Sequence, residues 1–142
     1  MNSRPPDCME LMKRIHDVLE KNANHGLMRH GITFAQLHML MALDRAEDGT
    51  QKLKELEKYF CVAQSTAAGL AVRLEKKGLV QSFADAGDRR VKQLRITDAG
   101  REVCRDTKAG MEETRRRFLS GLDPEEQEQF TRLLQKVYHA IR

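Results

Sequence analysis

Apolar residues recur every three or four positions over most of this chain, and they alternate with polar residues over one short stretch. The first pattern is typical of helices that bury one face. It predicts helices near the N-terminus, from 33 through 43, over 52–60 and 65–77, from 97 through 118, and from 123 through 141. The alternation around Leu94 and Ile96, after a turn that contains Gly87, predicts a β-hairpin. The expected fold class is mostly α with a small β-hairpin.

The third and fourth predicted helices lie close together in the sequence and suit a helix-turn-helix. Residues 61–64 predict a tight turn between them, and the second helix ends at Gly78 after lysines in its last turn. Leu70, Leu74 and Leu79 are expected to pack on the preceding helix. The opposite side is small and polar at its start, as a helix that enters a major groove requires. That side carries Gln64, Ser65, Thr66, Ala68 and Gly69, with Arg73 one to two turns further on.

The predicted hairpin has a cationic tip. Arg89 and Arg90 follow the glycine-containing turn, and Lys92 extends the basic edge. A rigid hairpin that presents guanidinium groups suits a phosphate backbone or a narrow minor groove, although a solvated turn with incidental charge has the same sequence. The preceding helix-turn-helix favours the first interpretation, and the whole segment predicts a winged helix-turn-helix.

The end of the second helix and the hairpin form one motif at fixed spacing. The helix ends in Leu74-Glu75-Lys76-Lys77-Gly78-Leu79, and the hairpin supplies Asp88, Arg90, Ile96, Thr97 and Gly100. This motif resembles the MarR family of bacterial transcriptional regulators, in which Leu-Glu-x-x-Gly-Leu leads to a wing of pattern Asp-x-Arg-x5-Leu-Thr-x-x-Gly. Ala63 departs from the family, whose members usually carry a Ser or Thr that caps the recognition helix. Loss of such a cap costs about 1 kcal/mol.

Two apolar stripes at the ends of the chain have little domain left to cover them. One runs from Leu11 to Leu19 and the other from Phe130 to Ile141. They predict a two-fold dimer in which the terminal helices interdigitate, although they could also pack on each other within one chain. The family resemblance implies a homodimer and a pseudo-palindromic site in double-stranded DNA with half-sites about one turn apart. It also implies a single domain over 1–142, with a DNA-binding lobe at 33–100 and dimerisation helices at 1–32 and 101–142.

The net charge of the chain is concentrated on the winged helix-turn-helix. The formal net charge is +4, and residues 52–101 hold 11 Lys or Arg against 6 Asp or Glu. This balance favours nucleic acid as the partner, and the absence of Trp argues against RNA recognition by base stacking. No apolar run of about 18 residues predicts a membrane span, and residues 1–6 do not form a secretory signal. We therefore expect a cytoplasmic protein without a membrane partner.

Each residue of the winged helix-turn-helix then has an expected role. DNA affinity is expected mainly from Arg73, Arg89, Arg90 and Lys92, through phosphates or the minor groove. Sequence choice is expected mainly from Gln64, Ser65 and Thr66, with Arg73 able to reach a guanine. Asp88 is a poor DNA ligand by charge, and we expect it to orient Arg90 through a salt bridge within the wing. The expected outcome is repression by covering a promoter, relieved when a signal changes the spacing of the recognition helices.

The sequence says less about that signal. Members of the MarR family often bind small aromatic compounds where the dimer helices meet the DNA-binding lobe, others sense oxidants through a cysteine, and some bind metal. Met is adaptable and suits such a pocket, which we predict at Met12, His16, His38 and Met41. Cys8, near Arg4 and Lys13, is the redox candidate, whereas Cys104 is expected in the core. The five histidines lack metal-ligand spacing, so we expect no metal and no cofactor.

Two other classes of function compete with that of a DNA-binding regulator. An enzyme is not expected, because the chain has no Gly-rich phosphate loop, no G-x-S-x-G and no H-E-x-x-H. A helical protein-interaction adaptor is the better rival, since its helices would dock a partner while the hairpin stays solvated. The wing separates the two hypotheses, because an adaptor has no need of Arg89 and Arg90.

Overall fold

The secondary structure follows the hydrophobic pattern closely. The computed structural model describes residues 4–142, apart from the side chain of His25. The helices are α1 (Cys8–Leu27), α2 (Phe34–Arg45), α3 (Leu53–Phe60), α4 (Gln64–Lys76), α5 (Asp98–Leu119) and α6 (Pro124–Ile141), with short 3-10 helices η1 (Met28–His30) and η2 (Glu47–Gly49). The strands are β1 (Thr50–Lys52), β2 (Val80–Ala84) and β3 (Lys92–Ile96). The predicted fold class is confirmed. The expectation for residues 1–6 falls partly on residues 1–3, which lie outside the described residues.

Side-chain caps fix where several helices begin. Thr33 and Gln36 form the capping box predicted for α2: each side chain accepts a hydrogen bond from the other residue's backbone N–H at 3.2 Å. Asp123 and Glu126 form the same reciprocal arrangement at the start of α6. Asp7 caps α1 by accepting from the Glu10 N–H at 2.9 Å. Each cap satisfies amide groups that the first turn of a helix leaves free, and is worth about 1 kcal/mol.

An antiparallel sheet of order β1-β3-β2 supports the wing. β2 and β3 pair along their whole length, which leaves residues 85–91 as the wing tip. Leu94 and Ile96 are buried, as their alternation with polar residues predicts. β1 pairs with the other edge of β3 and places Gln51 opposite Leu94. The sequence pattern does not predict β1, because three residues are too few to show alternation.

The hydrophobic core lies where α2, α3, α4 and the sheet meet. Its most deeply buried side chains are Leu37, Met39, Leu40, Leu43, Leu56, Leu74, Val80 and Leu94. The core also takes Leu27 from α1, and Val103 and Cys104 from α5. The burial of Cys104 is therefore as expected. Helix α5 runs unbroken through the boundary expected at 100/101, and the predicted limits of the lobe stay a prediction.

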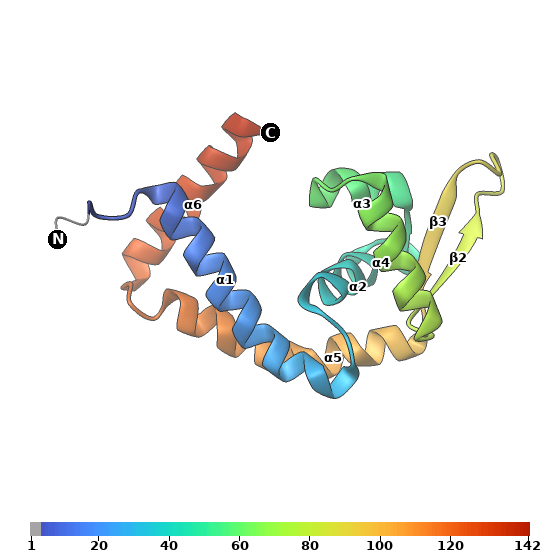
Figure 1. The fold of residues 1–142 in the computed structure, drawn as a ribbon, viewed down its shortest axis with the longest axis horizontal. Helices are drawn as coiled ribbons and strands as arrows, with labels where there is room; N and C mark the ends of the chain where they lie inside the picture. The colour runs from blue at the N-terminus through green and yellow to red at the C-terminus, as the bar shows by residue number, and fades with distance from the viewer. Residues whose placement is uncertain (1–3) are drawn as a thin grey trace.

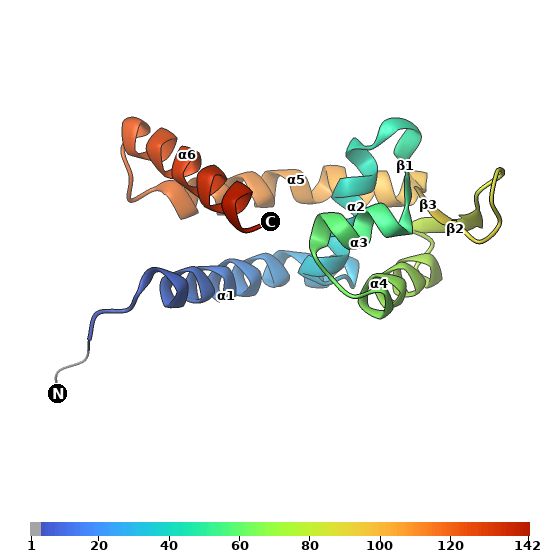
Figure 2. The ribbon, with the colours of Figure 1, turned by 90° about the horizontal axis from the view of Figure 1, so that it is seen from above.

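Helix α5 connects the lobe to the terminal helices (Figure 1). The lobe stands at one end of α5, α1 packs along it, and α6 turns back from its far end. Seen from above, α4 and the wing lie at the end of the molecule remote from α6 (Figure 2). Over residues 4–142, no helix combines the length and the apolar character that crossing a membrane requires.

The terminal helices leave their apolar faces uncovered within one chain. Exposed apolar residues on these faces are Leu11, Met12, Ile15 and Val18 of α1 and Leu133, Val137, Tyr138 and Ile141 of α6. Phe118 and Phe130, with ring centroids 5.9 Å apart, join α5 to α6 near the turn between them. Both stripes stay exposed, so the two stripes do not pack on each other within this chain.

Thr97 joins the end of α4, the sheet and the start of α5. Its hydroxyl donates to the Gly78 carbonyl at 2.7 Å and accepts from the Gly100 N–H at 3.1 Å. Its own N–H donates to the Leu79 carbonyl at 3.0 Å. Gly100 is buried at this junction, where a Cβ would collide with the Leu79 carbonyl oxygen and stand 2.7 Å from Ile96 Cγ1. The Thr-x-x-Gly of the motif is therefore a packing requirement.

We expect Gly100→Ala to lower the free energy of unfolding by about 1–3 kcal/mol, because the added methyl group has no room. Gly110→Ala is the matched control, since Gly110 also lies in α5 but has open space around its Cβ position. The control should gain roughly 0.5–1 kcal/mol from the higher helix propensity of Ala. Urea unfolding at one protein concentration measures both variants. Equal stabilities would contradict the packing role of Gly100.

Candidate DNA-binding interface

Small side chains hold α4 against the lobe. Ala67, Ala71 and Leu74 are buried at steps of four and three residues, on the side that packs against α2 and α3. Leu70, which the sequence pattern placed on this side, is half-buried at its edge. The two alanines leave room for α4 to approach its neighbours closely. They also explain why the hydrophobic pattern identifies this face poorly, because Ala contributes only a weak apolar signal.

The opposite side of α4 faces away from the lobe. Successive residues of an α-helix are about 100° apart, which places Ser65, Gly69, Val72 and Lys76 at the centre of this outward side. Gln64, Ser65, Thr66 and Arg73 are exposed, as a groove-reading helix requires, whereas Ala68 and Gly69 are half-buried. Ala68 packs partly against the core and lies at the rim of this surface. By the same spacing, Ser65, Thr66, Gly69 and Arg73 share the outward side, whereas Gln64 and Ala68 lie at its flank.

Two residues of this surface were missing from the sequence prediction. Val72 is 46% exposed beside Gly69, and Lys76 is exposed one turn further on. An exposed apolar side chain on a groove-reading helix suits the thymine methyl group. The signal that identifies Val72 is its spacing of seven residues from Ser65, which places both on one face. Gly69 between them has an open Cβ position, so the backbone is free to approach a surface there.

The start of α4 lacks a side-chain cap. Ala63 occupies the N-cap position and makes no side-chain hydrogen bond there, which agrees with its departure from the family pattern. The preceding turn closes through Cys61, whose backbone is left-handed with φ +52° and whose N–H donates to the Lys58 carbonyl at 3.2 Å. The first-turn N–H groups of α4 consequently have no side-chain acceptor, and such groups attract anions.

The wing tip carries the predicted ion pair between Asp88 and Arg90. The Asp88 carboxylate accepts from the Arg90 backbone N–H at 3.0 Å and from its Nε and Nη2 at 3.1 Å each. These hydrogen bonds from the Arg90 side chain, and then from its backbone, hold the pKa of Asp88 below its ordinary value. The Arg90 side chain remains 91% exposed. The pair therefore orients Arg90 without burying it.

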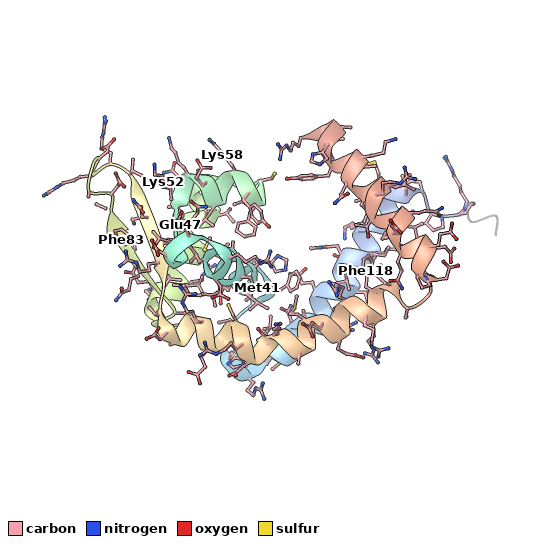
Figure 3. All side chains as sticks on the ribbon, turned by 180° about the vertical axis from the view of Figure 1, so that it is seen from behind. Met41, Glu47, Lys52, Lys58, Phe83 and Phe118 are labelled. Carbon is pink, nitrogen blue, oxygen red and sulfur yellow. The ribbon has the colours of Figure 1, made fainter. Side chains whose placement is uncertain are left out.

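The remaining wing cations are also exposed. Arg89 and Lys92 are exposed at the tip and at the start of β3. Arg95, which the sequence prediction did not include, lies on the outer side of the sheet with its guanidinium 5.0 Å from the centre of the Phe83 ring, and its Nε donates to Thr50 at 3.2 Å. Figure 3 labels Phe83 on this side of the molecule. Because α4 packs beside β2, the cations of α4 and the wing belong to one end of the lobe.

Two of the four predicted effector residues are exposed on α1, and a third is half-buried on α2. Met12 is 52% exposed on α1, and His16 is exposed with its Nε2 3.7 Å from Glu20. His38 is half-buried on α2, with its ring centroid 4.2 Å from that of Phe34. Burial lowers the pKa of His38, and the nearby positive charges lower it further. The imidazole of His38 is therefore favoured in its neutral form.

A cavity of about 680 Å³ lies between α1, α2 and α5. Its apolar lining includes Leu19, Phe34, Met41, Met111 and Phe118, and its charged lining Asp44, Arg45, Lys108, Glu112 and Arg115. Figure 3 labels Met41 on α2 and Phe118 on α5, which line it from two helices. Of the four predicted effector residues, Met41 alone lines this cavity. A shared pocket for Met12, His16, His38 and Met41 stays a prediction.

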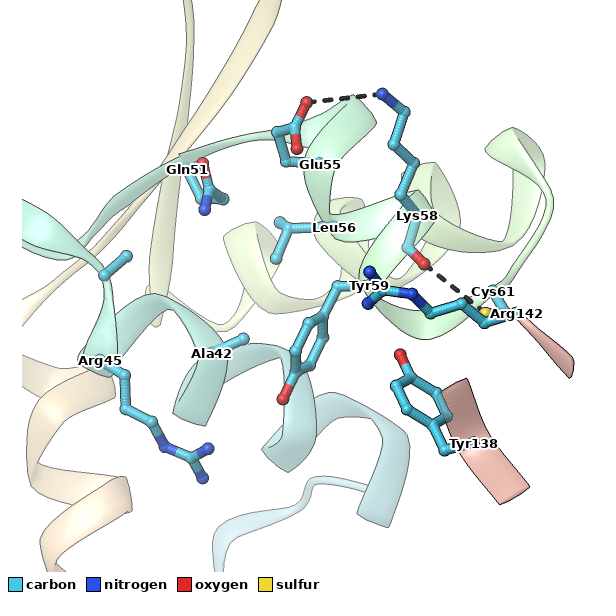
Figure 4. Close-up of a pocket in the computed structure, with 11 residues that line it drawn as sticks. Ala42, Arg45, Gln51, Glu55, Leu56, Lys58, Tyr59, Cys61, Tyr138 and Arg142 are labelled. Carbon is cyan, nitrogen blue, oxygen red and sulfur yellow. Dashed lines mark hydrogen bonds and ion pairs between the residues drawn. The ribbon is translucent and has the colours of Figure 1, made fainter. Parts of the chain in front are cut away.

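A second cavity, of about 790 Å³, lies between the lobe and the end of α6 (Figure 4). Tyr59 and Cys61 line it from the lobe, and Tyr138 and Arg142 from the C-terminal end of the chain. Lys58 and Glu55, which form an ion pair at 3.8 Å, also belong to its lining. Both cavities therefore occur where the lobe faces the terminal helices.

The three cysteines have different surroundings. Cys8 is exposed as the first residue of α1, Cys61 is exposed in the turn before α4, and Cys104 is buried. Burial raises the pKa of the Cys104 thiol to about 11, so this thiol is protonated and unreactive near neutral pH. The redox role of Cys8 stays a prediction. Among the side chains that the structure describes, which leave out His25, no three His, Cys, Asp or Glu come together as a metal ion requires.

A known family model matches the segment that runs from just after η1 to the start of β3. Residues 32–92 match the family model "MarR family". The fold resembles that of S. aureus MepR in a DNA complex, at 24% identity over 96% of this chain and 99% of that chain, with a TM-score of 0.89. A mutant MarR from E. coli complexed with operator DNA is 23% identical over 89% and 90% of the chains, with a TM-score of 0.81. BpsR from Bordetella bronchiseptica, whose DNA binding is regulated by 6-hydroxynicotinic acid, is 24% identical over 97% of both chains, with a TM-score of 0.84.

We expect Asp88→Ala to weaken binding to duplex DNA several-fold, although the substitution removes a negative charge from the wing. Arg90 loses the carboxylate that orients it, so binding must supply the ordering that the free protein no longer has. Fluorescence anisotropy titration of labelled duplex measures the change. Tighter binding by the variant would mean that Asp88 acts only through its charge.

Proposed function

We propose that this chain is a DNA-binding transcriptional regulator of the MarR family and acts as a dimeric repressor of a pseudo-palindromic promoter site. The match of residues 32–92 to the family model and the shared fold support this proposal. Helix α4 enters the major groove, and the wing contacts the adjacent backbone or minor groove. A small aromatic acid releases the protein from DNA. The protein catalyses no reaction in this role.

The observation that supports the proposal most is that the outward side of α4, with its small side chains, and the cations of the wing are both exposed. Ser65 and Gly69 give α4 an outward side without bulky groups in its first turns, so base edges come within reach. Arg73 supplies a cation on the same helix, and Arg89 and Arg90 supply two at the wing tip. Cations on two elements at one end of the lobe suit simultaneous contact with neighbouring stretches of the phosphate backbone.

The uncovered faces of α1 and α6 support the dimer. Val18 of α1 is 58% exposed, and Val137 and Ile141 of α6 are 50% and 80% exposed. Apolar residues gathered at helical spacing on an exposed face are typical of a protein–protein interface. A two-fold axis through the terminal helices would give the complex two α4 helices, one for each half-site about one turn apart.

The cavity between α1, α2 and α5 supports an aromatic acid as the signal. Its apolar lining suits a ring, and Arg45, Lys108 and Arg115 supply three cations for a carboxylate. Of the two acidic residues in the lining, Asp44 is already paired with Arg101 at 2.8 Å. The regulation of BpsR by 6-hydroxynicotinic acid is consistent with this ligand class in a protein of the same fold.

We expect the protein to bind an operator duplex, selected from random-sequence DNA, as two chains per duplex and with a steep salt dependence. The double substitution Arg89→Ala/Arg90→Ala should weaken binding about 10- to 100-fold and reduce the salt slope by roughly 2, because two cations leave the wing. Arg116→Ala/Arg117→Ala removes the same charge from α5 and is the matched control. Titration by anisotropy over a range of salt concentrations measures all three. Weak binding that is indifferent to sequence would favour the protein-interaction adaptor instead.

We expect 6-hydroxynicotinic acid, used as a probe, to weaken operator binding by the wild-type protein. Arg115→Ala removes a cation from the cavity lining and should reduce this effect several-fold. Arg116→Ala is the control, because Arg116 pairs with Glu113 at 2.7 Å and does not line this cavity. Operator titrations at fixed concentrations of the acid measure the effect. An equal response of both variants would exclude this cavity as the site of release.

A further inference from the structure

The carboxylate of Asp85 links the two sides of the wing tip through hydrogen bonds. Its Oδ2 accepts from the backbone N–H groups of Gly87 at 3.1 Å and Asp88 at 3.2 Å. Its Oδ1 accepts from the side-chain Nε2 of Gln93 on β3. We propose that Asp85 is a positioning residue for DNA binding, which presents Arg89 and Arg90 to DNA by holding the wing tip in one conformation. This inference rests on the proposed role of the wing in DNA binding.

The backbone closes the wing tip around the same carboxylate. The Asp85 N–H donates to the Val91 carbonyl at 2.8 Å, and the Val91 N–H donates to the Asp88 carbonyl at 3.0 Å. Asp85 is half-buried between these strands. Its backbone and its side chain therefore link the first half of the tip to the second, and the two arginines lie between the linked points.

The orientation of Arg90 depends on Asp85 through Asp88. Asp85 holds the backbone N–H of Asp88, and the Asp88 carboxylate holds both the N–H and the guanidinium of Arg90. A change in the Asp88 backbone would consequently redirect Arg90. Asp85 makes no ion pair with an arginine or lysine among residues 4–142, so its hydrogen bonds to the wing, rather than a cation partner, account for its position.

Gly87 allows the carboxylate its close approach. A Cβ at residue 87 would stand 3.3 Å from Asp85 Oδ2, which is tight for an oxygen that two N–H groups already hold. The sequence Asp85-Ala86-Gly87-Asp88 therefore specifies more than a flexible turn. Without the Asp85 carboxylate, residues 86–90 would lose two hydrogen bonds and Gln93 would lose one. The arginines would then have to be ordered when DNA binds.

Charge alone predicts the opposite behaviour. A carboxylate close to DNA repels phosphates, so its removal should tighten binding if Asp85 acts only through its charge. Asn at this position has the same shape and is well suited to accept hydrogen bonds from N–H groups two residues on, but it carries no charge. Asp85→Asn and Asp85→Ala therefore separate the two explanations, because they remove the same charge and differ in the hydrogen bonds they keep.

The test compares both variants in operator titrations, with the operator selected on the wild-type protein. We expect Asp85→Ala to bind about 10-fold more weakly than wild type, and Asp85→Asn to bind as tightly as wild type or more tightly. The Asp85→Ala change is then repeated in the Arg89→Ala/Arg90→Ala background, where it should have almost no further effect, because the residues it positions are gone. Thermal unfolding of each variant verifies that the lobe is intact, since the wing tip lies outside the core.

The possible results are distinct. Equal affinities of Asp85→Ala and Asp85→Asn, or a 10-fold loss that persists in the background without arginines, would overturn the positioning role. If either result accompanies a wild-type protein that binds the operator and loses affinity in Arg89→Ala/Arg90→Ala, DNA binding through the wing still stands. A wild-type protein that selects no operator would overturn both proposals.

Discussion

The hydrogen bonds of Thr97 determine how the two halves of this protein are placed relative to each other. Through one hydroxyl and one N–H, Thr97 joins the carbonyls that follow α4 to the first turn of α5. Because α5 continues unbroken for 22 residues, its direction at Thr97 also fixes where α1 and α6 lie relative to the lobe (Figure 1). Gly100 is what permits this contact, since no side chain fits between α5 and the Leu79 carbonyl. In the proposed dimer, the spacing of the two α4 helices follows from this junction.

The parts of the structure that depend on local chemistry could be predicted from the sequence. The caps at Thr33 and Asp123 and the ion pair of Asp88 with Arg90 involve residues no more than three positions apart. The parts that depend on distant contacts could not. Strand β1 forms because Gln51 and its neighbours pair with the free edge of β3. The cavity lined by Met41 requires side chains from three helices. The inward side of α4 could be predicted only in part. Leu74 indicates it from the sequence, but the burial of Ala67 and Ala71 becomes evident only in the folded structure.

The charged residues of the wing illustrate why geometry decides what a charge does. Counted by sign, Asp85 and Asp88 cancel Arg89 and Arg90, and the tip has no net charge. The hydrogen bonds give a different picture. Both carboxylates accept hydrogen bonds from backbone N–H groups or a neighbouring guanidinium, whereas the arginines remain exposed. A phosphate that approaches the tip therefore meets cations first, with acceptors already occupied behind them. Acidic residues in a DNA-binding hairpin are consistent with tight binding when their role is to support the cations.

Hydrogen bonds at the end of α4 suggest how a ligand in the cavity between α1, α2 and α5 would act on both α4 and the wing. Helix α2 forms one wall of the cavity beside Met41 and also carries Gln36, whose Oε1 accepts from Lys77 Nζ at the end of α4 at 3.0 Å. Lys77 also donates to the Gly31 carbonyl, between α1 and α2. A ligand that separates α2 from α5 must either carry the end of α4 along or break these hydrogen bonds. Thr97 ties that end to α5 and the sheet. Residues 77–79 are therefore bonded to both α2 and α5, the two helices that such a ligand would separate. A small displacement there would change the angle of α4 and the wing together, and in a two-fold dimer the change would appear at both half-sites.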